Sequence, residues 1–134
     1  MKISLTKDTS YNRINHVTDG QIVVNQAPYT SSIIVSSDTV IETSLICAFD
    51  QLTAKHFDEV VRLHPEIVIL GTGNQHRNLS AELQGYFYQQ KIGFEAMSTN
   101  AACRTYNLLV EDQRNVVAYL ILEACPDREN SRPG

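Results

Sequence analysis

The sequence predicts a mixed α/β fold built in three layers. Its first half is rich in β-branched residues and in turn-forming residues, and it shows little helical periodicity. Its second half alternates short apolar runs with amphipathic stretches, in the order strand, helix, strand, helix, strand. That order is typical of a parallel βαβ sheet. We therefore expect an antiparallel β-layer from the N-terminal half, packed with a mostly parallel sheet and helices.

The N-terminal half supplies several short strands. Turn residues separate apolar and β-branched runs there, and we expect two or three of the runs to pair as antiparallel hairpins. A turn is expected from Asn25 to Pro28. The predicted strands cover residues 2–6, 21–24, 29–35, 40–42 and 45–47.

The C-terminal half begins with a helix over residues 53–63, in which Phe57, Val60 and Val61 fall at helical spacing. Pro65 ends this helix, because the residue before a proline is pushed out of the helical region. The continuous apolar run 66–70 has the pattern of a parallel strand that is covered on both faces.

Two further strand and helix pairs follow. Ser80 is a suitable N-cap for a helix over 80–91, and Gly93 ends that helix. A strand over 94–97, a helix over 100–110 and a strand over 115–122 come next. We assign residues 1–125 to a single globular domain and residues 126–134 to a flexible polar tail.

Composition excludes several classes of protein. A formal net charge of −4 and a pI near 5.5 argue against a nucleic-acid binder, which normally shows a basic face. The sequence has no apolar run of about 18 residues and no signal peptide, so we expect no membrane insertion and a cytoplasmic location. The three cysteines lack paired spacing, which disfavours a disulfide framework or a structural zinc site. No metal or cofactor is predicted.

Two loops are the predicted functional site. In a parallel sheet, ligands bind outside the carboxyl ends of the strands. The loops Gly71-Thr72-Gly73-Asn74 and Ser98-Thr99-Asn100 both follow such strands, so we expect a crevice between them. Glycines let backbone amides approach an anion closely, although the Gly-Thr-Gly element fits an ordinary turn equally well.

The helix after Ser98 contributes the second wall of this crevice. Ser98, Thr99 or Asn100 caps it, and its first amides carry partial positive charge. Arg104 and Asn107 lie on one face with Glu111, so Arg104 either holds a carboxylate or phosphate, or pairs with an acidic neighbour. The face expected to pack on the sheet contains Ala101, Ala102, Thr105, Leu108 and Leu109.

Cys103 is a candidate reactive thiol, because a helix start lowers the pKa of a cysteine. The histidine best placed to act as its base is His76, in the neighbouring loop. The alternative is that Cys103 is a small packing residue. The sequence contains no set of nucleophile, base and orienting residue, and we name no catalytic residue.

These residues resemble a known family. The run Ile67 to Gly73, followed by Met97 to Asn107, is similar to a family of small proteins of unknown function, the Mth-domain family. That family includes the mitochondrial NADH dehydrogenase (complex I) assembly factor 3 and the adipogenesis-associated Mth-domain protein. The resemblance spans most of residues 12–122 and implies a compact three-layer fold. Ser98 departs from the family pattern, which usually has Asp there.

Three functions remain open. We favour a binding or assembly-type protein, linked through the resemblance to respiratory complex I assembly, with a small anion or a protein partner bound at the two-loop crevice. The runner-up is a small enzyme or sensor that acts on an anionic metabolite through Cys103 or Arg104. The third is a structural interaction module. Strand edges in the N-terminal half are compatible with a homodimer.

Overall fold

A five-stranded sheet forms the centre of the molecule. The structure is a computed structural model, and it describes residues 11–43 and 49–123. The strand order is β5-β4-β8-β6-β7, in which β6 runs parallel to β7 and β8, and β4 runs antiparallel to β5 and β8. The prediction of a mixed α/β fold with a βαβ sheet and an antiparallel N-terminal layer is confirmed, and the large sheet is mixed, since two of its four strand pairs are parallel. The strands are β4 (Ile33–Val35), β5 (Val40–Glu42), β6 (Ile67–Gly71), β7 (Gly93–Met97) and β8 (Val116–Leu120).

A second sheet is antiparallel and comes from the N-terminal half. Its order is β1-β2-β3, with β1 at Ile14–Thr18, β2 at Gln21–Val24 and β3 at Ala27–Tyr29. Asn25 and Gln26 join β2 to β3 with φ angles of 52° and 71°. Positive φ at both positions of a two-residue turn matches the twist of a hairpin.

One expectation for the N-terminal half needs correction, and others fall outside the described residues. The predicted strand over 29–35 is two strands, because Tyr29 ends β3 in the small sheet while Ile33 starts β4 in the large one. Between β3 and β4, Ser32 is buried, and its hydroxyl accepts a hydrogen bond from the Leu122 amide at 2.9 Å. This bond holds the segment that passes from the small sheet to the large sheet. The predicted strands over 2–6 and 45–47 and the predicted tail over 126–134 lie outside the described residues.

The helices follow the predicted order. Thr53 and His56 cap each other at the start of a 3-10 turn, η2, which continues into α2. His64, with a φ of 53°, and Pro65 then end this helical segment. The bounds are η1 (Phe49–Gln51), η2 (Ala54–Phe57), α2 (Asp58–Arg62), α3 (Ala81–Gln89) and α4 (Thr99–Glu111). None of the helices in the described part of the chain is long and apolar enough to cross a bilayer.

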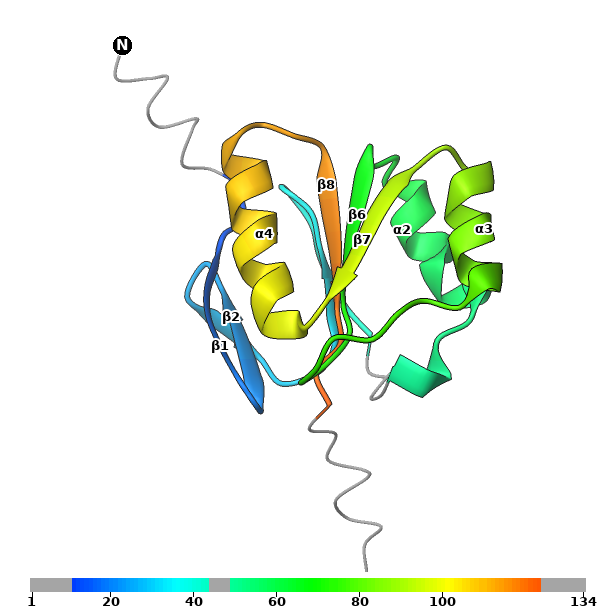
Figure 1. Ribbon diagram of the computed structural model, residues 1–134. Helices are drawn as coiled ribbons and strands as arrows, with labels where there is room; N and C mark the ends of the chain where they lie inside the picture. The colour runs from blue at the N-terminus through cyan, green and yellow to red at the C-terminus, as the bar shows by residue number, and fades with distance from the viewer. Residues whose placement is uncertain (1–10, 44–48, 124–134) are drawn as a thin grey trace, which may run out of the picture.

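The large sheet is covered on both faces, and each cover has its own apolar core (Figure 1). On one face, α4 packs on β6 and β8 and the small sheet packs beside it. On the other face, α2 and α3 bury a cluster around Phe57, Phe87 and Tyr119, in which the Phe57 ring meets each of the other two rings edge to face. All five residues of β8 are buried, as expected for a strand covered twice.

The inward face of α4 differs from the predicted one. Thr99, Ala102, Cys103, Tyr106 and Val110 are buried, whereas Leu108 is 68% exposed. Tyr106 points inward because its hydroxyl donates to the carbonyl oxygens of Asn12 and Ser36, at 2.8 and 3.1 Å. A buried phenol with such partners is stabilising rather than costly.

Candidate functional site

The two predicted loops meet at the carboxyl ends of β6 and β7, where they are hydrogen-bonded to each other. The amide of Gly73 donates to the Thr99 hydroxyl, and the amide of Thr99 donates to the Gly73 carbonyl, both at 2.9 Å. A Cβ added to Gly71 would lie 2.9 Å from the Thr99 Cα. Glycine at 71 is therefore required by close packing of the loops.

Thr72 and Ser98 serve the same junction. The Thr72 amide donates to the Met97 carbonyl at 2.7 Å, and its hydroxyl donates to the Gln75 carbonyl at 2.6 Å. Ser98 is the N-cap of α4, and its hydroxyl accepts from the Ala101 amide at 3.3 Å. The prediction that one of residues 98–100 caps this helix is confirmed. A serine fills that role as an aspartate would.

A carboxylate of the chain itself lies against the glycine loop. The amide of Asn74 donates to Glu123 Oε1 at 3.0 Å. Gly73 has a φ of 104°, and a Cβ there would lie 2.5 Å from the Glu123 carboxyl carbon. The loop amide predicted to face an anion therefore already has an anionic partner. An external anion would have to displace Glu123.

Open space lies on the other side of the helix start, beside β1. A hollow of about 280 Å³ separates β1 from the first two turns of α4, and one of about 210 Å³ lies next to it. We call the two together the β1–α4 groove, because Val17 and Asn100 line both. The predicted residues that line it are Gly73, Asn74, Thr99, Asn100, Cys103, Arg104 and Asn107.

Arg104 is the exposed cation of this groove. One guanidinium nitrogen donates to Asn100 Oδ1 at 3.2 Å. Across the described residues it forms no ion pair, since Glu111 pairs with Arg13 instead, at 3.8 Å. The alternative that Arg104 is neutralised by Glu111 or Asp112 therefore finds no support in the geometry.

Cys103 lines the same groove but is 3% exposed. Burial raises the pKa of its thiol to about 12, and the nearby Arg104 opposes this shift only in part. The direction is opposite to the lowering expected at a helix start. Desolvation of the thiolate outweighs the attraction of the Arg104 guanidinium here.

Asn107 uses its side chain to hold β1 in place. Its Oδ1 accepts from the Ile14 amide at 2.9 Å, and its Nδ2 donates to the Ile14 carbonyl at 2.8 Å. The amide thus substitutes for a neighbouring strand on the outer side of β1. Both of its polar atoms are occupied, so Asn107 positions the groove wall.

The groove also contains residues that the sequence did not predict. Asn15 and His16 line the larger hollow and Asp19 lines the smaller one, all from the β1 hairpin. β1 itself was not predicted, because Ile14 and Val17 do not alternate. A register shift between Ile14 and His16 places both apolar residues on the core face. The segment has no regular pattern that would have indicated a strand.

Comparison with known proteins confirms the predicted family resemblance. Residues 14–121 match the family model described as "Protein of unknown function (DUF498/DUF598)". The chain is 29% identical over 103 residues to "13 kDa major membrane protein" of Francisella tularensis subsp. holarctica (strain LVS), covering 76% of this chain and 84% of that protein. It is 34% identical over 56 residues to NADH dehydrogenase (ubiquinone) 1 alpha subcomplex assembly factor 3 of Xenopus tropicalis, covering 42% of this chain and 31% of that protein.

Solved structures share the fold. A crystal structure of a Bordetella parapertussis protein has a TM-score of 0.79 and 30% identity, over 85% of this chain and 98% of that one. A solution structure of a Mth938-like domain from Bordetella pertussis has a TM-score of 0.80 and 24% identity, over 93% and 95%. The crystal structure of an outer membrane protein from Bartonella henselae has a TM-score of 0.76 and 24% identity, over 84% and 96%. The last two likenesses concern the fold alone.

Proposed function

The chain belongs to the family of proteins of unknown function DUF498/DUF598, and we propose that it is a binding or assembly-type protein. Its ligand is a small anion, or an anionic group of a partner, held in the β1–α4 groove. The partial match to an assembly factor of NADH dehydrogenase supports an assembly role, with respiratory complex I as the first system to test. We also propose a cytoplasmic location, which subcellular fractionation tests.

The observation that carries this proposal is the state of Arg104. It is an exposed guanidinium without a carboxylate partner among the described residues, and it lines a hollow of about 280 Å³. Asn100, Asn15 and His16 add hydrogen-bonding side chains to the same hollow. Guanidinium binds carboxylate and phosphate through two parallel hydrogen bonds. Since the chain has a net charge of −4, this positive site is local rather than part of a basic face.

The alternative is a small enzyme or sensor that uses Cys103 or Arg104 on an anionic metabolite. A nucleophilic cysteine needs its thiolate, and a pKa of about 12 keeps the Cys103 thiol protonated at neutral pH. His76, its proposed base, does not line the groove with it. Within residues 11–43 and 49–123, no three His, Cys, Asp or Glu side chains are grouped as metal ligands. The geometry therefore favours binding.

Thermal unfolding in the presence of phosphate, citrate and nucleotides tests the proposal. We expect at least one of these anions to raise the Tm of the wild-type chain, because a ligand at 100 times its Kd stabilises by about 2.7 kcal/mol. Arg104→Ala should abolish this rise and leave the Tm without anion nearly unchanged. Arg62→Ala is the matched control, since Arg62 is an exposed arginine on α2, across the large sheet. An equal rise in both variants, or no rise in the wild type, would overturn the proposal.

A further inference from the structure

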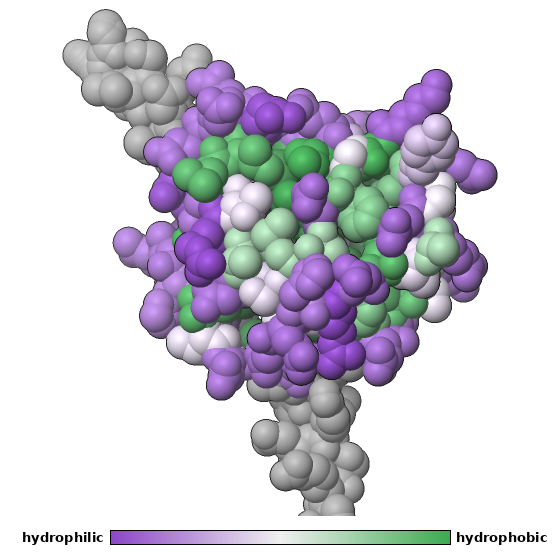
Figure 2. Space-filling model, in the orientation of Figure 1, coloured by the Kyte–Doolittle hydropathy of each residue, from purple (hydrophilic) through white to green (hydrophobic). Residues whose placement is uncertain are grey.

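The edge strand β7 is a second candidate for contact with a partner. It lies between α4 and α3, and its outer edge is open in Figure 1. Figure 2 shows the same face as a mostly white and green surface across α4, β7 and α3, with hydrophilic residues around it. This surface lies apart from the β1–α4 groove.

The backbone of β7 presents unused hydrogen-bonding groups on that side. Gly93 donates to the Glu66 carbonyl at 3.1 Å, and the Met97 carbonyl accepts from Thr72 at 2.7 Å. In a parallel pair, alternate residues direct both backbone groups to the same neighbour. Phe94 and Ala96 therefore direct their N–H and C=O groups outward, away from β6.

The other sheet edges in the described ranges are shortened or covered, whereas the edge of β7 is protected only by the charge of Glu95. Edge strands normally avoid pairing by being short, by carrying proline or charged side chains, or by being covered. β5 and β3 have three residues each, and β3 contains Pro28. The outer side of β1 is covered by Asn107. β7 has five residues in continuous register with β6, without proline or a bulge.

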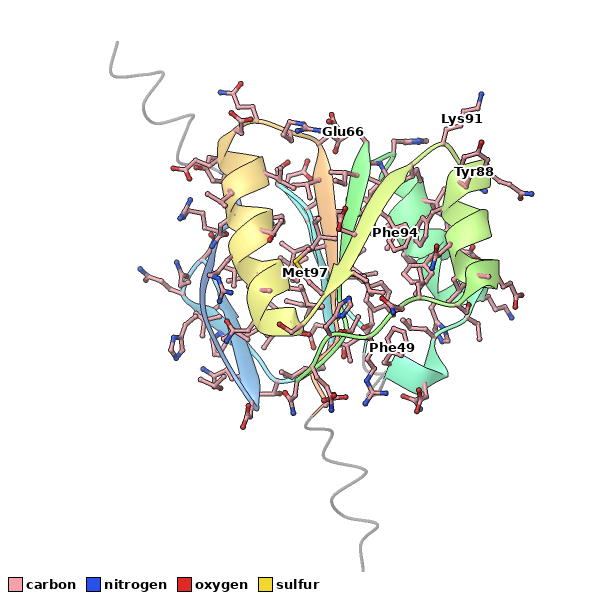
Figure 3. The ribbon with its side chains drawn as sticks, in the orientation of Figure 1. Phe49, Glu66, Tyr88, Lys91, Phe94 and Met97 are labelled. Atoms are coloured by element: carbon pink, nitrogen blue, oxygen red, sulfur yellow. The ribbon has the colours of Figure 1, made fainter. Side chains whose placement is uncertain are left out.

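The side chains of β7 flank this edge on both faces of the large sheet. Phe94 lies on the α3 side, where its ring stacks on Phe87 at 5.3 Å, and Met97 lies on the α4 side (Figure 3). Both are partly buried and so can contact an added strand. Between them Glu95 is exposed, and in the described part of the chain it forms no ion pair.

Glu95 argues against a second copy of the chain as the occupant. If two copies of β7 paired antiparallel about a twofold axis, the axis would pass beside Phe94, Glu95 or Ala96. In each of these three registers the two Glu95 side chains lie on the same face of the sheet, either directly opposite each other or diagonally adjacent. Like charges at such positions are destabilising, whereas a lysine or arginine there is favourable.

We propose that β7 accepts an extended segment of a partner protein as a sixth strand of the large sheet. The segment would bond to the outward backbone groups of Phe94 and Ala96, as in other cases of strand addition. It would carry a basic residue beside Glu95 and an apolar residue against Phe94. The proposal is independent of the anion site and does not rest on it.

The probe is a set of peptides selected for binding to the full chain from a display library of random nine-residue sequences. We expect the selected peptides to combine β-forming residues with a lysine or arginine. Ala96→Pro should weaken their binding at least about tenfold, because proline removes an outward N–H while leaving the bonds to β6 in place. Ala81→Pro is the matched control, because it adds a proline at the first position of α3, where it is tolerated.

Two further measurements keep the test decisive if Ala96→Pro fails to fold. N-methylation of every second peptide residue should abolish binding when the methylated amides are those that face β7. N-methylation of the other alternate set of residues should leave binding unchanged. Glu95→Lys should weaken binding of a lysine-containing peptide, and lysine-to-glutamate exchange in the peptide should restore it. The proposal would be overturned if no peptide is selected, or if the peptides bind Ala96→Pro as tightly as the wild-type chain. It would also be overturned if the peptide changes backbone amide NMR shifts only in the β1–α4 groove. A dimer that Ala96→Pro dissociates would assign the edge to a second copy instead.

Discussion

At the scale of single residues, burial decides which side chains of α4 are chemically available. Cys103 and Arg104 are neighbours in sequence, yet one is buried and the other is exposed. Desolvation raises the pKa of Cys103 to about 12, while the Arg104 side chain is exposed to solvent. The sequence placed both at one helix start. It could not separate them, because the inward face of α4 depends on where the Tyr106 hydroxyl finds its partners.

The thiol of Cys103 should react slowly. In a chain carrying Cys47→Ser and Cys125→Ser, only Cys103 remains, and iodoacetamide should modify it far more slowly than free cysteine at pH 8. The rate should not level off before about pH 11, because the thiol pKa is about 12. A rate profile with a midpoint below pH 8 would restore the reactive-thiol hypothesis.

The same shift predicts loss of stability in alkali. Cys103 titrates near its ordinary value of 9.0 when unfolded but at about 12 when folded, so the unfolded state releases its proton first. Burial also raises the pKa of Tyr106 and of Tyr119, with the same sign. The free energy of unfolding, measured in urea, should therefore fall between pH 9 and pH 12. Cys103→Ala should make that fall smaller.

At the scale of elements, the junction between β6 and α4 depends on glycine. Gly71→Ala would bring a Cβ within 2.9 Å of the Thr99 Cα, a backbone atom that cannot move away cheaply. We expect a loss of about 1–3 kcal/mol in the free energy of unfolding. Gly85→Ala is the control, since nothing lies within 4 Å of its Cβ position and a helix gains up to about 1 kcal/mol from alanine. Equal effects in urea unfolding would refute this account of the junction.

The contact between α4 and β1 makes a separate prediction. Asn107→Ala leaves the amide and the carbonyl of Ile14 without their partner, and each such loss costs about 1–3 kcal/mol. Hydrogen exchange of the Ile14 amide should become faster, and urea unfolding should shift to lower concentration. Leu108→Ala, on the exposed side of α4, should change neither by much. Unchanged exchange at Ile14 would contradict the positioning role of Asn107.

The elements were predictable to different degrees. The run from β6 to β8 follows from apolar strands, a Ser80 cap and glycine stops, all of which are local signals. The β1 strand was missed, since its bulge between Ile14 and His16 removes the alternation that marks a strand. The groove wall that β1 forms was therefore missed too.

At the scale of the whole molecule, α4 lies between the two proposed binding surfaces. The β1–α4 groove lies on the face covered by the small sheet, and β7 is at one edge of the large sheet. As the carboxyl-end rule predicted, the Gly71–Asn74 loop and the start of α4 lie at the same edge of the large sheet. The rule could not show that the glycine loop is closed by Thr99 and Glu123, because those contacts join residues far apart in sequence.

The most direct test of the central claim is an NMR titration of the full chain with inorganic phosphate, with citrate and with a nucleotide. If the anion binds in the β1–α4 groove, the amides of Asn15, His16 and Asn100 and the side-chain Nε of Arg104 should shift together, with one dissociation constant. These shifts should disappear in Arg104→Ala and persist in Arg62→Ala. Shifts confined to residues outside the β1–α4 groove, or no saturable shift with any of the three anions, would contradict the account.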